Sequence, residues 1–255
     1  MAKRDVTERF TGKADVYARY RPGYPERLLG YLSNACGLLP AHVVADIGSG
    51  TGKLSEAFLA NGNVVYGVEP NSDMRRLGEL HLAGNGRFHS IAGTAEATGL
   101  ATVSVDMVSA GQAFHWFDPE RSREEFRRIL KPSGCVVLVW NVRNSTASKF
   151  LGEYEAFLKE FSVDYSELYH GRVTEGDGLS GFFTHDYATA HFPNPRRLDF
   201  DALRGGYLST SYAVAPEDAE RFALAMKRLR ALFDEYQENG TVGMPLETNI
   251  YHGRV

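Results

Sequence analysis

The sequence has few cysteines, no long apolar run and no excess of basic charge. Its two cysteines, Cys36 and Cys135, lie far apart, which suggests neither a disulfide framework nor a cysteine metal site. No stretch approaches the roughly 20 apolar residues of a membrane span, and the charged amino terminus MAKRDVTERF lacks the apolar segment of a secretory signal. The formal net charge of -4 lacks the basic excess that binding to nucleic acid usually needs. These absences predict a cytoplasmic chain without nucleic-acid or membrane partners.

The composition is that of a globular protein, with 43% hydrophobic and 24% charged residues in a chain of 255. Apolar runs alternate with segments of helical spacing through the first part of the chain. The runs that we interpret as strands are residues 42–48, 63–70, 87–93, 105–111 and 135–141. Because strand, helix, strand is the unit of a parallel sheet, this alternation predicts an α/β fold with a doubly wound sheet.

The sequence changes character beyond residue 141. We expect helices over residues 148–161 and 216–239, and a strand-like segment, 241–255, that returns to the sheet. The second helix has an apolar face that we interpret as core, formed by Phe222, Met226, Leu229, Phe233 and Tyr236. We predict one domain over residues 1–255, divided into an N-terminal lid or arm (1–40), a cofactor-binding core (41–142) and a helical insertion with closing strands (143–255).

A glycine-rich loop, ADIGSGTGKLS, follows the first predicted strand. It is not a nucleotide-triphosphate loop, because that motif would need a glycine at Ile47 and a hydroxyl at Leu54. A dinucleotide fingerprint that starts at Gly48 would need a third glycine where Lys53 stands. Asp46, two residues before the first glycine, would also repel a pyrophosphate. A ligand with a cationic group suits this loop better.

S-adenosylmethionine is such a ligand, because it carries an ammonium, a sulfonium, a carboxylate, a ribose and an adenine. The glycines let the backbone approach its methionine part, and the helix start near Gly52 offers partial positive charge to its carboxylate. Asp46 favours its ammonium, directly or through water. Glu69, at the end of the second predicted strand, can accept hydrogen bonds from the ribose hydroxyls, as it also would in a dinucleotide site. Glu69 therefore indicates a ribose rather than one particular cofactor.

Ordered motifs between Val43 and Asn141 resemble those of the class I S-adenosylmethionine-dependent methyltransferases. ADIGSGTGKLS is similar to their glycine-rich first motif, VVYGVEPNSDM to the second strand with its ribose-binding acid, GTAEATGL to the adenine-side loop, and RRILKPSGCVVLVW to the helix and fifth strand. The resemblance implies S-adenosyl-L-methionine as cofactor and S-adenosyl-L-homocysteine as product. It also implies a Rossmann-like, mostly parallel sheet of seven strands whose last strand is reversed.

The same resemblance implies which residues bind the cofactor. They are Asp46, Gly48, Ser49, Gly50, Gly52, Glu69, Pro70, Met74, Thr94, Ala95, Glu96 and Gln112. Members of the family commonly carry an acidic residue near Thr94. In this sequence Thr94, Ala95 and Glu96 share the adenine side, and which of them makes the contact stays open.

A narrower resemblance lies in three further segments, YARYRPGYPERLLGYL, GQAFHWFDPE and IYHGRV. They are similar to a heterogeneous group of small-molecule methyltransferases that includes trans-aconitate methyltransferase-like proteins. The likeness implies methyl transfer to an O, N, C or S nucleophile of a small-molecule acceptor, mainly by positioning. It names neither the acceptor nor the oligomeric state, monomer or homodimer.

Two of these segments supply the candidate residues for the acceptor side. In a doubly wound sheet, residues after the fourth strand lie at the carboxyl edge beside the cofactor, and residues before the first strand can fold over it as a lid. The candidate substrate-binding residues are Tyr17, Tyr20, Arg21, His115, Trp116, Phe117 and Arg143. His115 is the candidate catalytic residue, as a base or as a positioning group, and ordinary packing is the alternative for both segments. The histidines show no metal-like spacing, so we expect no metal.

Two other functions stay open at this level. A nicotinamide-dependent oxidoreductase shares the sheet and the ribose acid, although its third glycine is missing here. A non-catalytic S-adenosylmethionine-binding module would keep the cofactor site and block the acceptor site, and no sequence feature excludes it.

Overall fold

The structure is a computed structural model that describes residues 12–163, 165, 179, 181–184 and 187–255. At the centre of these residues is a seven-stranded sheet with the order β3-β2-β1-β4-β5-β7-β6. The strands are β1 (Val43–Ile47), β2 (Val64–Val68), β3 (Phe88–Ile91), β4 (Val105–Gly111), β5 (Leu130–Arg143), β6 (Ala188–Leu198) and β7 (Val242–Gly253). β1 to β5 run parallel, and β7 runs antiparallel to both of its neighbours, β5 and β6. The predicted doubly wound, mostly parallel sheet with a reversed last strand is confirmed.

The chain builds the sheet outward from β1 in two directions. β2 and β3 follow on one side of β1, and β4 and β5 follow on the other. In sheets of this kind, ligands bind outside the carboxyl ends of the strands, beside the point where the strand order reverses. β1 ends at Ile47 and β4 ends at Gly111, so this point adjoins the glycine loop.

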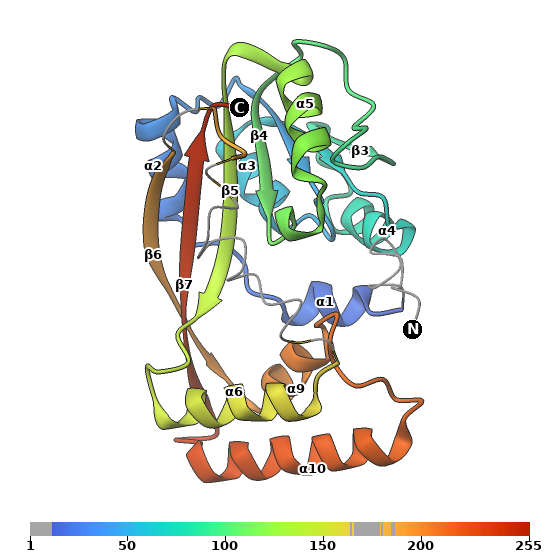
Figure 1. Ribbon diagram of the computed structural model, residues 1–255, viewed down its shortest axis with the longest axis vertical. Coiled ribbons are helices and arrows are strands. Elements are labelled where there is room, and N and C mark those ends of the chain that lie inside the picture. The colour runs from blue at the N-terminus through green and yellow to red at the C-terminus, as the bar shows by residue number, and fades with distance from the viewer. Residues whose placement is uncertain (1–11, 164, 166–178, 180, 185–186) are drawn as a thin grey trace.

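Helices cover both faces of the sheet, and a further helical layer lies at one end (Figure 1). Alternate residues of β5 show the two faces, because Val137 packs in the cluster that contains α2 and α3 residues, whereas Val136 packs in the cluster that contains α5 residues. The helices are α1 (Ala14–Tyr20), α2 (Arg27–Cys36), α3 (Lys53–Asn61), α4 (Ser72–His81), α5 (Pro119–Ile129), α6 (Lys149–Phe161), α9 (Phe200–Leu208) and α10 (Ala219–Tyr236).

β5 begins earlier than the sequence indicates. Its apolar run starts at Cys135, but the strand starts at Leu130, which pairs with Val105 of β4. The register then shifts before Met107 pairs with Cys135, and Pro132 between the two pairs is exposed. An irregular strand segment therefore joins α5 to the buried part of β5.

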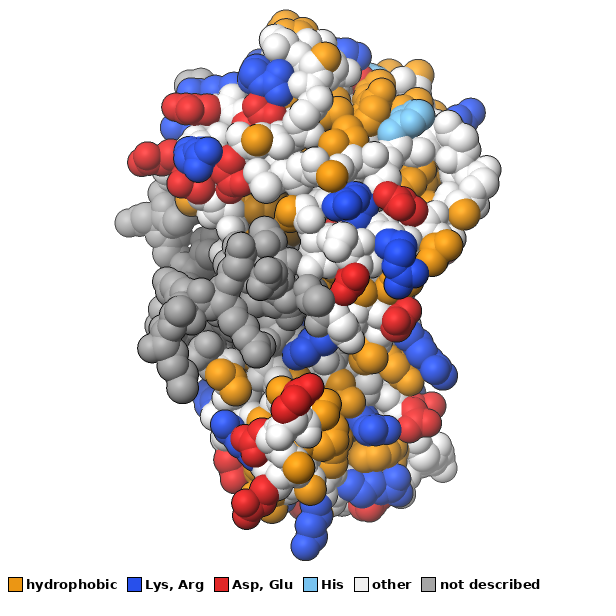
Figure 2. All heavy atoms as spheres, turned by 90° about the vertical axis from the view of Figure 1, so that its right-hand side faces the viewer, with side chains coloured by type: hydrophobic (Ala, Val, Ile, Leu, Met, Phe, Trp, Pro, Cys, Tyr) orange, Lys and Arg blue, Asp and Glu red, His pale blue; other side chains and the backbone are white. Residues whose placement is uncertain are grey.

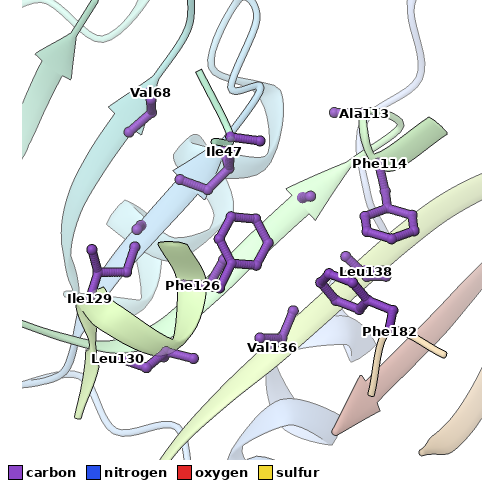
Figure 3. Packing of buried hydrophobic residues seen from close by; sticks show 14 of the residues in the cluster. Ile47, Val68, Ala113, Phe114, Phe126, Ile129, Leu130, Val136, Leu138 and Phe182 are labelled. Carbon is purple, nitrogen blue, oxygen red and sulfur yellow. The ribbon is translucent and has the colours of Figure 1, made fainter. Parts of the chain in front are cut away.

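Apolar side chains fill the space between α5 and the sheet. Figure 3 shows Phe126 and Ile129 of α5 in this cluster with Ile47, Val136 and Leu138 of the strands. Phe126 is 0% exposed and meets Phe117 and Phe182 edge to face, with ring centroids 6.3 Å and 6.0 Å away. This packing fixes α5 and the loop that precedes it.

A second apolar cluster holds the helical layer of α6, α9 and α10 together with the ends of β6 and β7. The face predicted for residues 216–239 lies in this cluster. Leu229 and Phe233 are buried, while the remaining predicted members, Phe222, Met226 and Tyr236, are partly buried against it. The prediction that this face belongs to the core is confirmed.

Helix α1 crosses between the sheet and the helical layer (Figure 1). Just before it, Gly12 N donates a hydrogen bond to Asp73 Oδ2 at 3.2 Å, and Lys13 Nζ donates to the carbonyl of Thr210 at 2.9 Å. At its end the ring of Tyr20 lies so close to Gly205 of α9 that no side chain fits at that glycine. The N-terminal arm therefore connects the sheet side of the molecule to the helical layer.

The surface carries both signs of charge. Figure 2 shows acidic and basic side chains interspersed over one face of the molecule. In this view the outline of the molecule is narrower between the sheet and the helical layer. Among the residues that the structure describes, no helix has both the length and the apolar character that crossing a bilayer requires.

Removing the Phe126 ring tests the importance of the α5 contact. We expect Phe126→Ala to lower the free energy of unfolding by about 3–5 kcal/mol, because a fully buried ring leaves a cavity. Leu80→Ala is the control, since Leu80 is 61% exposed and its loss should cost within about 0.5 kcal/mol. Denaturant unfolding measures both, and equal small losses would contradict this account of the core.

Candidate active site

A cavity lies at the carboxyl ends of β1, β2 and β4, and we call it the switch-point cavity. It is lined by Tyr17, Gly48, Gly50, Glu69, Pro70, Asn71, Met74, Thr94, Ala95, Glu96, Gly111, Gln112, Ala113, Trp116 and Phe117. These residues come from the glycine loop, from the end of β4, from the segments that follow β2, β3 and β4, and from α1. The position is the one that the strand order predicts for a ligand site.

Glycines shape the wall of this cavity. Gly48, Gly50 and Gly52 all have left-handed backbones, with φ of 66°, 55° and 83°. A Cβ at Gly48 would lie 2.6 Å from the Cβ of Ala113, and one at Gly52 would lie 2.7 Å from Leu82. A Cβ at Gly50 would meet nothing within 4 Å. Gly48 and Gly52 are therefore needed for packing, whereas Gly50 faces open space that a ligand can enter.

Glu69 links two backbone segments at this edge of the sheet. Its Oε2 accepts a hydrogen bond from Gly50 N at 2.9 Å, and its Oε1 accepts one from Asn71 N at 2.8 Å. The side chain is 8% exposed, and burial raises its pKa although the two backbone donors oppose the rise. Each carboxylate oxygen keeps a further lone pair. Glu69 therefore holds the glycine loop and can still accept hydrogen bonds from a ligand.

Asp46 is buried beneath the glycine loop. Its carboxylate accepts hydrogen bonds from Ser55 Oγ at 2.6 Å and from Ser109 Oγ at 3.1 Å. Burial raises its pKa to about 6, against the opposing effect of these hydroxyls. Asp46 lies on the wall of a narrow cleft that shares Tyr17 with the switch-point cavity. A cation in this cleft would stabilise the ionised carboxylate.

The predicted cofactor residues separate into three groups. Most line the switch-point cavity: Gly48, Gly50, Glu69, Pro70, Met74, Thr94, Ala95, Glu96 and Gln112. Asp46 and Ser49 line the narrow cleft beside it. Gly52 lines neither and packs against Leu82. Sequence reasoning did not assign Asn71, Gly111 and Ala113 to the cofactor, although Asn71 lies in VVYGVEPNSDM and the other two lie in GQAFHWFDPE.

A second cavity, which we call the helical cavity, opens between the sheet edge and the helical layer. It is lined by Tyr17, Tyr20, Arg21, Pro22, Gln112, His115, Trp116, Asn141, Arg143, Ser145, Tyr154, Glu155, Arg196, Leu198, Ala202, Leu203, Gly206, Thr210, Ser211, Tyr212, Met244 and Leu246. Tyr17, Gln112 and Trp116 line both cavities. The two cavities therefore adjoin at these three side chains.

The predicted acceptor residues fall into these two cavities. Tyr17, Tyr20, Arg21, His115, Trp116 and Arg143 line the helical cavity. Phe117 instead lines the switch-point cavity, where its ring lies 3.6 Å from the place of a Cβ on Gly48. Arg196, Tyr154 and Tyr212 were missed. Tyr154 lies in a helix that the sequence predicts, but only tertiary packing brings these three residues to the cavity.

Arg143 stands in a hydrogen-bonded chain on the wall of the helical cavity. Its Nη2 donates to the hydroxyl of Tyr165 at 3.2 Å, and this hydroxyl donates to Glu155 Oε2 at 2.8 Å. The guanidinium also lies 5.5 Å from the ring centroid of Tyr154, which suits a cation–π contact. These contacts hold the Arg143 guanidinium in place beside the cavity.

Two further guanidinium groups face the same cavity. Arg196 Nη1 donates to the carbonyl of Tyr20 at 3.1 Å, and Arg21 lies 5.0 Å from the ring centroid of Tyr17. The Nε of Arg21 is buried and makes no hydrogen bond within the described part of the chain. Among the described residues that line this cavity are three arginines and one carboxylate, that of Glu155. This part of the wall therefore carries an excess of positive charge. Such a wall favours an anionic ligand.

The two cysteines lie together near the amino ends of β4 and β5, although they are far apart in the sequence. Their sulfur atoms are 3.3 Å apart, and His252 Nδ1 lies 3.3 Å from Cys36 Sγ. Their separation in the sequence and the spacing of the histidines, from which we expected no metal, gave no indication that Cys36, Cys135 and His252 lie this close together.

Comparison with known proteins decides the family. A family model described as a methyltransferase domain matches residues 45–138. A methyltransferase-like protein of Schizosaccharomyces pombe is 33% identical over 256 residues, which cover 94% of each chain. The chain belongs to the class I S-adenosylmethionine-dependent methyltransferases. An uncharacterised methyltransferase of Mycobacterium tuberculosis is 36% identical to this methyltransferase over 143 residues, and the match spans 56% of each chain.

Solved structures of methyltransferases share the fold. One from Anaeromyxobacter dehalogenans, named as a type II methyltransferase, has a TM-score of 0.59 and 24% identity, covering 92% of this chain and 98% of its own. Phosphoethanolamine N-methyltransferase 2 of Haemonchus contortus, in complex with phosphomonomethylethanolamine and S-adenosylhomocysteine, has a TM-score of 0.51 and 15% identity, covering 98% and 58%. Because the chain belongs to the methyltransferase family, methyl transfer takes the place of the alternative reading as a nicotinamide-dependent oxidoreductase.

The cofactor of a methyltransferase of this class, S-adenosylmethionine, fits the residues present. Gly50 leaves open space, Glu69 keeps free lone pairs, and Asp46 is a buried carboxylate for a cationic group. The hydroxyl of Thr51, on the wall of the narrow cleft, is buried without a hydrogen-bond partner among the described residues. A polar ligand group in the cleft would satisfy this hydroxyl.

Asp46→Asn tests whether the Asp46 carboxylate is desolvated in the folded protein. Burial raises its folded-state pKa to about 6, whereas an unfolded aspartate has a pKa of about 4. Between these values the folded protein binds more protons than the unfolded chain, so the free energy of unfolding falls as the pH rises. From about pH 4 to about pH 7, we expect the wild type to lose about 2 kcal/mol relative to Asp46→Asn in urea unfolding without cofactor.

The control for this prediction is Asp201→Asn, at an exposed position in the first turn of α9. The free energy of unfolding of Asp201→Asn should differ from that of the wild type by less than about 0.5 kcal/mol at every pH in this range. A difference between the wild type and Asp46→Asn that does not change with pH would contradict the desolvation of Asp46.

Proposed function

We propose that this methyltransferase transfers the methyl group of S-adenosylmethionine to a small-molecule acceptor that carries an anionic group. The observation that carries this proposal is the junction of the two cavities at Tyr17, Gln112 and Trp116. On one side of the junction lies the glycine loop with Glu69, and on the other side lie three arginines. A cofactor on the first side and an anion on the second would meet at the junction.

The residues around the switch-point cavity hold the cofactor in this proposal. Glu69 accepts hydrogen bonds from the ribose hydroxyls through its remaining lone pairs. The segment Thr94 to Glu96 borders the adenine, and Asp46 and Thr51 bind the methionine part in the narrow cleft. When bound, the cofactor supplies an electrophilic methyl group on its sulfonium. The chain then needs to align the acceptor and exclude water.

The residues of the helical cavity hold and orient the acceptor. Arg21, Arg143 and Arg196 bind its anionic group, and the aromatic rings of Tyr17, Tyr20 and Trp116 keep water out. An ionised carboxylate oxygen can attack without a base. His115 takes the proton only from an acceptor whose nucleophile is a hydroxyl or a protonated nitrogen, and otherwise it positions the acceptor. The narrower resemblance to small-molecule methyltransferases supports a small acceptor, and the three arginines of the helical cavity support an anionic one.

A labelling experiment tests the proposed function. The protein is incubated with methyl-labelled S-adenosylmethionine and a cell extract that has been separated into small molecules and macromolecules. We expect label in a small molecule that an anion exchanger retains or, if the methylated group is its only anion, in its neutral ester. Label on macromolecules alone would contradict the acceptor class. Absence of any transfer, despite binding of S-adenosylhomocysteine, would favour the non-catalytic module.

Glu69→Gln tests the cofactor side. The variant keeps the size of the side chain but loses the charge that would face the ribose, and because its amide nitrogen cannot accept, it also loses one of the hydrogen bonds from Gly50 N and Asn71 N. We expect the affinity for S-adenosylhomocysteine to fall by about 1.5–3 kcal/mol. Titration calorimetry measures this, with Glu79→Gln of α4, outside both cavities, as the matched control. Circular dichroism checks that both variants are folded. Unchanged affinity in folded Glu69→Gln would remove Glu69 from the site.

Arg143→Met tests the acceptor side once labelling has identified the acceptor. Loss of a charged donor to the anion should lower kcat/KM by about 10- to 100-fold, while the affinity for S-adenosylhomocysteine stays within about threefold. Arg197→Met is the control, because Arg197 is exposed and lies outside the cavity that Arg196 lines. Equal kcat/KM values for the two variants would show that the helical cavity does not bind the anionic group.

A further inference from the structure

Three side chains with metal-binding atoms meet near the amino end of β5, whereas the switch-point cavity lies at the carboxyl ends of the parallel strands. Cys36 Sγ lies 3.3 Å from Cys135 Sγ and 3.3 Å from His252 Nδ1. The three atoms all lie within 4.8 Å of one another. None of these residues lines the switch-point cavity, the helical cavity or the narrow cleft. The cluster therefore serves no purpose in the proposed methyl transfer.

The sheet and α2 bring the three residues together. His252 of β7 pairs with Val137 of β5, and Cys135 lies two residues before Val137. Because side chains two residues apart share one face of a strand, Cys135 and His252 project from the same face. Helix α2 packs on this face through Leu28 and ends at Cys36. The cluster joins one helix and two strands that are distant in the sequence.

A hydroxyl orients the imidazole of His252. Tyr31 Oη lies 2.8 Å from His252 Nε2, and the two rings meet edge to face with centroids 5.5 Å apart. With its proton on Nε2, the imidazole donates to Tyr31 and turns the lone pair of Nδ1 toward the sulfur atoms. Metal-bound histidines commonly use their second nitrogen in this way. His252 is 8% exposed, so its ring has little freedom to turn.

We propose that Cys36, Cys135 and His252 bind one zinc ion through two thiolates and Nδ1. Two sulfurs and one imidazole nitrogen suit the borderline-soft Zn²⁺ ion, and water can supply the fourth tetrahedral ligand. Binding releases two thiol protons for one Zn²⁺ and involves no oxidation or reduction. The ion ties α2, and with it the N-terminal arm, to β5 and β7.

The distances favour a metal over a disulfide. Zinc–sulfur bonds of about 2.3 Å at tetrahedral angles separate two sulfurs by about 3.8 Å. The observed 3.3 Å separation needs only a small outward movement of the two sulfurs. A disulfide of about 2.05 Å would need them to approach by more than about 1 Å. A disulfide would also leave Nδ1 of His252 without a function.

Zinc titration of the reduced, metal-free protein tests the proposal. Competition with a chromogenic chelator should give one Zn²⁺ per chain for the wild type, and Cys36→Ser and Cys135→Ser should each bind at least about 100-fold more weakly. Co²⁺ in place of Zn²⁺ should give the thiolate charge-transfer absorption of a tetrahedral site. This spectrum is measured on the wild type, so the test does not depend on the folding of a variant.

Two single variants separate ligation from general effects on the fold. Tyr31→Phe removes the hydroxyl that orients His252 and should weaken Zn²⁺ binding by about 10- to 100-fold with the stoichiometry unchanged. His89→Gln changes an exposed histidine on β3 and should bind Zn²⁺ as the wild type does. Absence of thiolate absorption with Co²⁺, or equal Zn²⁺ affinity in the wild type and Cys135→Ser, would overturn the proposal. So would isolation of the native chain with Cys36 and Cys135 joined in a disulfide.

Discussion

The carboxylate of Glu69 is the constraint on which the cofactor site depends. It accepts one backbone hydrogen bond from Gly50 and another from Asn71, so a single side chain fixes the glycine loop and the start of α4 at the end of β2. With the loop held there, Gly50 opens toward the cavity, and Gly48 packs against Ala113 after β4. The buried Asp46 lies beneath the same loop. Two acidic side chains at the ends of neighbouring strands thereby define a site for a ligand with a ribose and a cation.

The N-terminal arm joins this site to the helical cavity. Tyr17 of α1 lines both cavities, and Tyr20 at the end of α1 fits against Gly205, where a larger residue would clash with it. Arg196, from β6 on the edge of the sheet, also binds the carbonyl of Tyr20. The wall of the helical cavity is therefore built from segments that are far apart in the sequence. Its three arginines distinguish it from the switch-point cavity, which Glu69 lines, and from the narrow cleft, which Asp46 lines.

The sequence predicts the parts of the molecule that depend on local patterns. The parallel strands, the glycine loop and Glu69 are predictable because strand ends, turns and helix starts leave signals within a few residues. Arg196 and Tyr212 carry no such signal, because only the packing of the helical layer brings them to the cavity. The extension of β5 to Leu130 escaped prediction because Lys131, Pro132 and Gly134 favour a turn in isolation. The proximity of Cys36, Cys135 and His252 could not be predicted. It depends on the register of β5 against β7 and on the packing of α2, and the spacing of these residues in the sequence shows neither.

The central claim is that the cofactor and the acceptor occupy adjoining cavities on either side of Tyr17, Gln112 and Trp116. A crystal structure of the protein with S-adenosylhomocysteine tests it most directly. The account predicts that the ribose hydroxyls lie within hydrogen-bond distance of Glu69 and that the sulfur faces the helical cavity between Gln112 and Trp116. A ribose away from Glu69, or a sulfur that faces away from the arginine-lined wall, would contradict it.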